Sequence, residues 1–197
     1  MEVINCQQNT PEWESCRLGM LTASEAQAIS ANGKGLETLC LKLVAQKLTG
    51  KQEKGYFNSD MERGHELEME ARNAYELETD NEVTTVGFCK LDDMTGASPD
   101  GMIGDDGLIE IKCFKDTNFL EYMLSGKVDT GYEWQMQMQM YVTDRKWCDY
   151  VVYNPNFKKS LIIKRINRDE IAIEKIKVGI ETGKAMIKAM MEKLCEE

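Results

Sequence analysis

The segment GASPDGMIGDDGLIEIK, residues 96–112, limits the fold of this 197-residue chain more than any other stretch. Two strand-like runs flank a turn of Gly and Asp, which predicts a β-hairpin. Successive side chains of a strand point to opposite faces of its sheet. Glu110 and Lys112 therefore share one face, while Ile109 and Ile111 share the other. The hairpin is expected to hold a carboxylate and an ammonium group in one small space.

Helix and strand signals along the rest of the chain predict an α/β fold. Capping residues and apolar spacing favour helices at residues 11–17, 22–32, 36–48, 59–78, 118–124, 132–142 and 170–194. Strand-like composition and turn signals favour strands at residues 83–91, 97–103, 108–113, 147–153 and 161–166. No repeat, low-complexity tract or linker interrupts them. We therefore predict a single domain over residues 1–197, with a mixed central β-sheet flanked by α-helices.

The chain is acidic, with a formal net charge of −10 at pH 7, which by itself argues against a polyanionic partner. Acidic side chains gathered around a divalent cation would inflate that value. Two local stretches are basic and would be able to line a groove: Lys42, Lys47, Lys51 and Lys54, and then Lys158, Lys159, Lys164, Arg165 and Arg168. The alternative is that both stretches are solvated faces.

The seven cysteines are scattered and form no C-x-x-C pair. An odd number of unpaired cysteines favours reduced thiols in a cytoplasmic compartment, and argues against a zinc ribbon or an iron–sulfur cluster. The N-terminus lacks a basic region followed by an apolar one, and no apolar run approaches the length of a membrane span. Neither a secretory signal nor a membrane partner is expected.

Two carboxylates and a lysine of the hairpin suit a magnesium site. The Pro99-Asp100-Gly101 bend can aim Asp100 at the face that carries Glu110 and Lys112. Carboxylates and a backbone carbonyl, for which Ile111 is the candidate, are the oxygen ligands that Mg²⁺ prefers. A metal-bound water would then be a nucleophile, oriented or deprotonated by Lys112. The alternative is an exposed edge hairpin with an ordinary Glu/Lys pair.

The predicted helix at residues 59–78 supplies a further carboxylate. One stripe of this helix consists of Gly64, Glu68, Ala71 and Tyr75. The small and aromatic residues suggest that the stripe faces inward, where Glu68 needs a partner such as a metal. The alternative is a rim glutamate that reaches solvent. His65, the only histidine, is expected at the surface beside the site, and a ligand role for it is the minority interpretation.

Residues 98–101, SPDG, followed by residues 110–112, EIK, resemble the PD-(D/E)xK nuclease signature, and more narrowly the phage lambda exonuclease and YqaJ-type viral recombinase family. Three further stretches resemble motifs of that family in the same order: WESCRLGMLTAS at residues 13–24, GHELEMEAR at residues 64–72 and YEWQMQ at residues 132–137. The resemblance extends over roughly residues 11–145.

The resemblance implies a restriction-endonuclease-like core and a 5′→3′ exonuclease that acts on double-stranded DNA during phage recombination. It implies Mg²⁺ as the cofactor, with Mn²⁺ as a substitute, a ring-shaped homotrimer, and a single-strand annealing protein as partner. The compartment would be the cytoplasm of a bacterial host. Asp100, Glu110 and the Ile111 carbonyl would be metal ligands, Lys112 the catalytic lysine, and Glu68 the last member of the acidic cluster.

Arg17, Ser24, Ser98 and Gln135 correspond to the family's pocket for a terminal 5′-phosphate. Ser24 is expected in the first turn of a helix, where free N–H groups favour an anion. Because residues two apart on a helix diverge, Gln135 and Gln137 cannot both face the site, and we choose Gln135. An alternating strand would put both on one face. The secondary candidates are Gln137, His65 and Tyr141.

Two other functions compete with the exonuclease. One is an endonuclease or single-strand nuclease of the same fold. The other is a DNA-end-binding protein without catalysis, which the complete set of Asp100, Glu110 and Lys112 disfavours, because a binding module has no need of a lysine beside two metal carboxylates.

Overall fold

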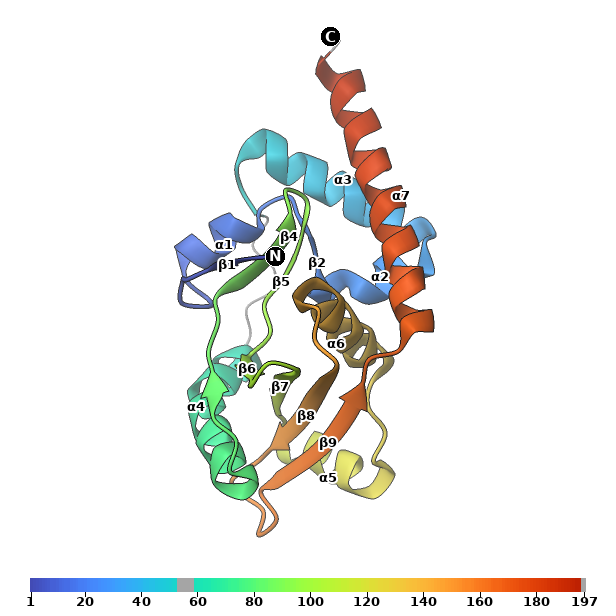
Figure 1. Ribbon diagram of the computed structural model, residues 1–197. Helices are drawn as coiled ribbons and strands as arrows, with labels where there is room; N and C mark the ends of the chain where they lie inside the picture. The colour runs from blue at the N-terminus through green and yellow to red at the C-terminus, as the bar shows by residue number, and fades with distance from the viewer. Residues whose placement is uncertain (53–58, 196–197) are drawn as a thin grey trace.

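The computed structural model describes residues 1–52 and 59–195, with side chains at residues 1–52 and 67–194 (Figure 1). The helices are α1 (Pro11–Arg17), α2 (Ala26–Ala31), α3 (Lys34–Thr49), α4 (Ser59–Thr79), α5 (Asp116–Ser125), α6 (Thr130–Thr143) and α7 (Glu170–Cys195), with a 3₁₀ turn η1 at Ala23–Glu25. The strands are β1 (Glu2–Ile4), β2 (Leu21–Thr22), β3 (Val83–Thr84), β4 (Phe88–Asp92), β5 (Thr95–Ala97), β6 (Gly101–Ile103), β7 (Gly107–Cys113), β8 (Trp147–Tyr153) and β9 (Leu161–Asn167).

Within the described residues, the strands form two sheets rather than one central sheet. The first has the order β1-β4-β5-β2, and the second has the order β3-β6-β7-β8-β9. The second sheet is mixed, because β7 and β8 run parallel while its other neighbouring strands run antiparallel. Parallel neighbours need a crossover connection, which α5 and α6 supply. The prediction of a mixed α/β architecture is confirmed, and its division into two sheets is new.

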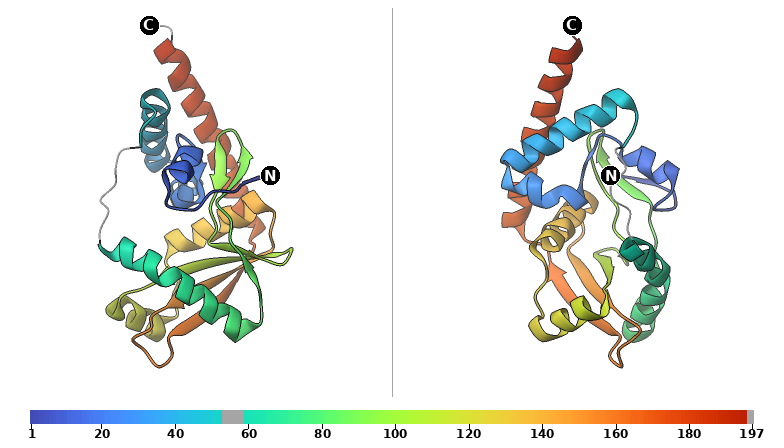
Figure 2. Two further views of the ribbon diagram at one scale, coloured as in Figure 1. Left: turned by 90° about the vertical axis from the view of Figure 1, so that its left-hand side faces the viewer. Right: turned by 180° about the vertical axis from the view of Figure 1, so that it is seen from behind.

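Helices cover both faces of the second sheet (Figures 1 and 2). On one face, Ala71 and Tyr75 of α4 pack against Ile109 and Ile111 of β7 in a small apolar cluster. On the other face, α5 and α6 join a larger cluster that includes Leu108 of β7. The alternation along β7 therefore separates two apolar layers, and it places Glu110 and Lys112 on the α6 side, next to the larger core.

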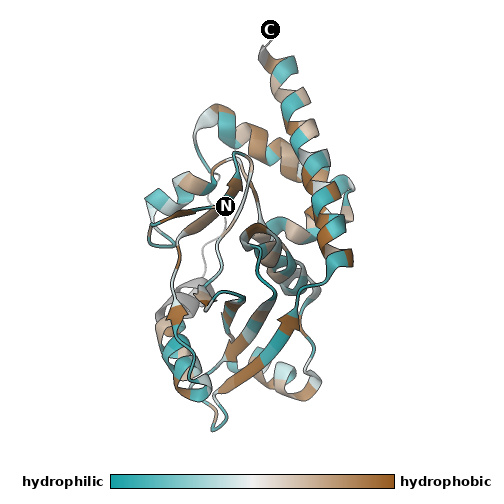
Figure 3. Ribbon diagram, in the orientation of Figure 1, coloured by the Kyte–Doolittle hydropathy of each residue, from teal (hydrophilic) through white to brown (hydrophobic). Residues whose placement is uncertain are grey.

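Helix α7 packs its apolar stripe against α2 and α3, and its C-terminal end projects beyond the body of the molecule (Figures 1 and 3). Ile173, Ile176, Ile180 and Ile187 are the buried members of that stripe. The contact with α2 is close, since a Cβ at Gly179 would collide with the carbonyl of Ile29. Among the described residues, no helix is long and apolar enough to cross a membrane.

Two predicted strands divide between the sheets. Residues 83–91 form β3 and β4, and residues 97–103 form β5 and β6, with one member of each pair in either sheet. The Gln8 side-chain amide donates to the Val86 carbonyl and to the Pro99 carbonyl, at 2.9 Å from each oxygen. Both chain segments therefore pass from one sheet to the other beside Gln8. There the Gln8 side chain donates to two backbone carbonyls that a continuous strand would pair with a neighbouring strand.

The second predicted helix begins differently from expectation. Residues 23–25 form the 3₁₀ turn η1, and the α-helix begins only at Ala26. Thr22 precedes the turn η1 and makes no side-chain capping hydrogen bond to it. Ser24 therefore lies in a short 3₁₀ turn and not in the first turn of an α-helix, so the expected helix-dipole argument for an anion at Ser24 was wrong. The predicted stop at residue 32 is confirmed, because Asn32 caps α2 with a left-handed backbone (φ 50°).

Candidate active site

Asp100 lies where β6 begins, opposite the middle of β7. Gly101 pairs with Ile109, so one step back along this antiparallel register brings Asp100 opposite Glu110. The strand pairing ends there, and the Ile111 N–H donates to Asp100 Oδ2 at 2.6 Å. The bend at Pro99 thus aims the Asp100 carboxylate at the backbone of β7, next to the two residues whose face it was expected to reach, Glu110 and Lys112.

Glu110 is 1% exposed and accepts three hydrogen bonds. Lys112 Nζ and Gln135 Nε2 donate to its Oε1 atom, at 2.6 and 2.7 Å. Gln139 Nε2 donates to its Oε2 atom at 2.7 Å. A buried carboxylate with an ammonium and two amides is fully solvated by the protein, which offsets the cost of removing its charge from water.

Lys112 is a cation in this arrangement. Its Nζ lies 2.6 Å from Glu110 Oε1 and 4.5 Å from the centre of the Tyr132 ring. Burial lowers the pKa of Lys112, but the carboxylates of Glu110 and Asp100 more than compensate, and the pKa lies above its ordinary value. In the absence of other cations, Lys112 is therefore a charged hydrogen-bond donor.

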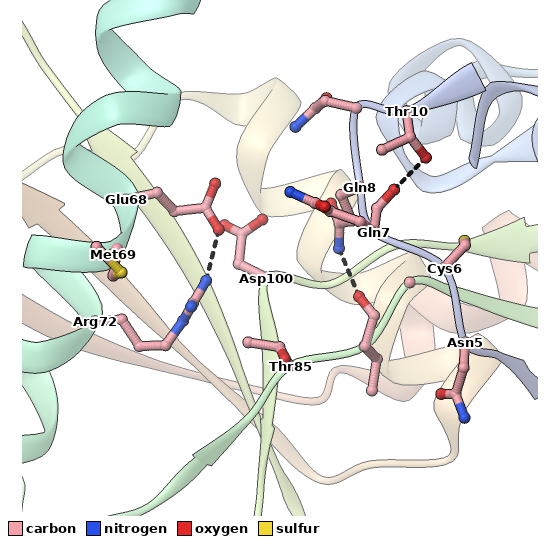
Figure 4. Close-up of a pocket in the computed structure, with 13 residues that line it drawn as sticks. Asn5, Cys6, Gln7, Gln8, Thr10, Glu68, Met69, Arg72, Thr85 and Asp100 are labelled. Atoms are coloured by element: carbon pink, nitrogen blue, oxygen red, sulfur yellow. Dashed lines mark hydrogen bonds and ion pairs between the residues drawn. The ribbon is translucent and has the colours of Figure 1, made fainter. Parts of the chain in front are cut away.

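Three carboxylates influence each other electrostatically. Burial raises the pKa of Asp100 well above its ordinary value, and the charges of Glu110 and Glu68 raise it further, against the lowering effect of Lys112. Figure 4 shows the Glu68 and Asp100 carboxylates side by side. Arg72 Nη2 donates to Glu68 Oε1 at 2.7 Å, so Glu68 also has a cation partner. The crowding favours a further positive charge at Asp100.

A cleft of about 730 Å³ opens beside this cluster. Its walls come from the segment before α1, from α4, and from the connection between β3 and β4; they consist of residues 5–10, Glu68, Met69, Arg72, residues 85–87 and Asp100. Most of these side chains are polar or charged (Figure 4). Asp100 and Glu68 therefore line the cleft, whereas the buried Glu110 does not.

Arg17 and Ser24 come together next to Ser98. Arg17 Nη2 lies 3.2 Å from Ser24 Oγ, and its guanidinium stacks 3.9 Å from the centre of the Trp13 ring. Trp13 Nε1 donates to Ser98 Oγ at 2.9 Å. Burial lowers the pKa of Arg17 to about 10, which leaves the guanidinium charged at neutral pH. These residues form a polar cluster around the Arg17 guanidinium, with Glu25 and Glu14 nearby, and Ser98 is two residues from Asp100 along the chain.

The structure separates the three glutamine and tyrosine candidates on α6. Gln135 faces Glu110, as chosen from the sequence. Gln137 points elsewhere, donating to the Asn167 carbonyl and accepting from the Asp169 N–H, both at 2.9 Å. The centre of the Tyr141 ring lies 5.8 Å from Lys177 Nζ of α7, so this side chain is directed toward α7. The side chain of the remaining secondary candidate, His65, lies outside the described residues.

Sequence reasoning missed Gln139, which binds Glu110 directly. The available signal was its spacing of four from Gln135, which puts both on one helix face. Reasoning also missed Arg72 as a partner of Glu68, although the pair has the same spacing.

The carboxylates of the site have the oxygen ligands that a magnesium ion prefers. Within the part of the chain that is described, no three side chains of His, Cys, Asp or Glu are already gathered as a metal site. Glu68 and Glu110 instead pair with Arg72 and Lys112, and Asp100 accepts from a backbone N–H. The candidate ligands are nevertheless all oxygen atoms, and burial, together with the charges of Glu110 and Glu68, raises the pKa of Asp100. This chemistry fits a hard divalent cation.

Comparisons with known structures define the class of the fold. The chain is 38% identical to an alkaline exonuclease, LHK-Exo, from Laribacter hongkongensis, over 95% of this chain and 97% of that one, with a TM-score of 0.87. LHK-Exo in complex with dAMP gives 39% identity over 94% and 96% of the chains, with a TM-score of 0.86. A phage related exonuclease from Haemophilus somnus shares the fold at 15% identity, over 89% and 96%, with a TM-score of 0.68. The fold is that of a PD-(D/E)xK nuclease.

Residues 12–146 match the family described as the YqaJ-like viral recombinase domain, and the chain belongs to that family. No curated protein sequence matches it. Family, fold and acidic site together support a nuclease of the exonuclease type.

Proposed function

We propose that this chain is a Mg²⁺-dependent exonuclease that degrades the 5′-ended strand of linear double-stranded DNA in the 5′→3′ direction. The 3′ overhang would pass to a single-strand annealing protein during phage-type recombination, in the cytoplasm of a bacterial host. The observation that carries the proposal is the convergence of Asp100, Glu110 and Lys112 on the β6–β7 hairpin. Lys112 donates to Glu110, and Asp100 accepts from the backbone N–H of Ile111, which lies between them in β7.

Asp100, Glu110 and the Ile111 carbonyl would hold the metal, with Glu68 beside them. The bound ion would supply an activated water and offset charge on the scissile phosphate. Lys112 Nζ, charged and fixed by Glu110, would donate to the attacking water or to a phosphate oxygen. Because Glu110 is buried, bulk water would not reach the metal from the side of the site where Glu110 lies.

Arg17, Ser24 and Ser98 would receive the terminal 5′-phosphate. A charged guanidinium stacked on Trp13 is restrained, so it loses little freedom when it binds a phosphate. Ser98 is two residues from Asp100, which is a short path between a terminal phosphate and a site of cleavage. That LHK-Exo binds dAMP supports the proposal, because dAMP is one DNA nucleotide, the unit that an exonuclease releases.

The first test is digestion of a linear duplex with Mg²⁺, comparing 5′-phosphorylated and 5′-hydroxyl ends. We expect mononucleotides from the 5′-phosphorylated strand, and a rate at least about 100-fold lower in Lys112→Ala. Arg17→Gln is expected to remove the preference for the phosphorylated end, and Arg17→Lys to keep part of it, because lysine retains the charge without the planar fork. A wild-type protein that binds ends but leaves both strands intact with Mg²⁺ and Mn²⁺ would contradict the proposal.

A covalently closed circular duplex separates the exonuclease from the endonuclease alternative. An exonuclease needs an end, so the circle is expected to survive under conditions that degrade the same DNA after linearisation. Cleavage of the circle, or faster digestion of single strands than of duplex, would favour the alternative on the same fold.

A further inference from the structure

The glutamines of α6 have two different environments. Gln135 and Gln139 are four residues apart and both donate to Glu110, one to each carboxylate oxygen. Gln137, between them in sequence, is turned to the connection between β9 and α7. Two glutamines of α6 thus donate to a buried carboxylate, and the third bonds to the backbone of a neighbouring segment.

The side-chain amide of Gln139 has a buried oxygen without a hydrogen-bond partner in the described part of the chain, which costs stability. Its side chain is 0% exposed, and its Oε1 atom is buried with no hydrogen-bond partner among the described residues. A buried acceptor without a partner is destabilising. Rotating the amide by half a turn would not help, because the oxygen would then face Glu110 Oε2 and two negative atoms would repel. The amide orientation is therefore set by Glu110 Oε2, and by the Ser98 carbonyl to which the same nitrogen donates at 3.5 Å, and the unpaired oxygen is the consequence.

We propose that Gln139 is a positioning residue that fixes the Glu110 carboxylate for the metal. It holds Oε2 from the buried side, so that Oε1 is the oxygen presented next to Lys112. Gln135, which is half-buried, and Lys112 donate to that oxygen from the more open side. The inference rests on the proposed function, since it takes Glu110 to be a metal ligand. Residues that orient a metal ligand without touching the metal contribute to its affinity.

The test compares Gln139→Met with Gln137→Met, two changes of the same kind on one helix. Metal binding is measured by calorimetric titration of the full-length protein with Mn²⁺, and stability by thermal unfolding in EDTA. We expect Gln139→Met to weaken Mn²⁺ binding by about 10- to 100-fold. Its melting temperature is expected to change little, because the loss of the donor to Glu110 Oε2 and the removal of the unpaired Gln139 acceptor act in opposite directions.

Gln137→Met has the opposite expectation. It removes the partners of the Asn167 carbonyl and the Asp169 N–H, so the melting temperature is expected to fall by roughly 5 °C, while Mn²⁺ affinity stays within about two-fold of the wild type. Gln139→Asn provides a second variant, since its shorter amide stops short of Glu110 and is expected to weaken Mn²⁺ binding as well.

Mn²⁺ affinity equal to wild type in either folded Gln139 variant would overturn the inference. A wild-type protein that takes up no Mn²⁺ is a different result: it rejects the metal site of the proposed function itself, and the inference with it.

Discussion

At the scale of single residues, the site concentrates negative charge that the metal-free chain only partly neutralises. Glu110 pairs with Lys112 and Glu68 pairs with Arg72, whereas the hydrogen bond to Asp100 among the described residues comes from a backbone N–H, and the pKa of Asp100 is raised. A carboxyl group whose pKa is raised on folding costs stability in full at pH values above the raised pKa; the cost shrinks as the pH falls below that value and is gone below the ordinary pKa of the group. Functional sites often store such destabilisation.

Asp100→Asn is therefore expected to stabilise the metal-free protein. The amide cannot ionise, so it removes the cost of a carboxyl group whose charged form is disfavoured by burial and by Glu110 and Glu68, and the melting temperature in EDTA is expected to rise by about 3 °C. Adding Mg²⁺ is expected to stabilise the wild type and not the variant, since only the former keeps the ligand. Asp105→Asn, an exposed position in the same hairpin, is the control and should change neither. A lower melting temperature of Asp100→Asn in EDTA would be inconsistent with charge crowding.

At the scale of secondary structure elements, the position of Glu68 depends on how α4 is fixed to the sheet. The Tyr75 hydroxyl donates to Asp149 Oδ2 of β8 at 2.7 Å, and Arg165 of β9 donates to both oxygens of the same carboxylate. Tyr75 lies two turns after Glu68 on the same helix face. The helix that carries Glu68 is thus anchored by a buried polar network as well as by apolar packing.

Asp149→Ala is expected to lower the free energy of unfolding by about 2 to 3 kcal/mol. The substitution removes the acceptor to which the buried Tyr75 hydroxyl donates, while the half-exposed Arg165 regains water and reduces the cost. Urea unfolding measures the change. Lys146→Ala, which breaks the exposed pair with Asp106, is the control and should leave stability unchanged. Equal effects of the two substitutions would mean that the Asp149 network contributes little.

At the scale of the whole molecule, a net charge of −10 has to be reconciled with DNA as the proposed substrate. A ring of subunits would resolve the conflict by facing basic side chains to a channel and acidic ones to the outside. The C-terminal end of α7, which projects from the body, is available for contacts beyond this chain (Figure 1).

Light scattering coupled to size-exclusion chromatography is expected to give a mass of about three protomers of 22.5 kDa each. The homotrimer is a proposal, and a monomer at the concentrations used for digestion would count against a ring that threads DNA. End binding is also expected to weaken steeply as the salt concentration rises, because phosphate contacts release counterions.

The sequence by itself determined the local features of this protein. The two-residue period of β7 placed Glu110 and Lys112 on one face, and the helix signals located α4, α6 and α7 within a few residues. Such features depend on neighbours in the chain, so they can be predicted from it. The resemblance of the motifs indicated the family, which the comparisons confirmed.

Only the tertiary structure decided which distant groups meet. Whether residues 83–91 continue as one strand depends on which sheet each half can pair with, and Gln8, far away in sequence, takes part in that division. The choice of Gln139 rather than Gln137 as the second amide on Glu110 depends on which face of α6 turns toward β7. Both outcomes are set by packing and by hydrogen bonds across the molecule, and neither periodicity nor capping signals carry that information.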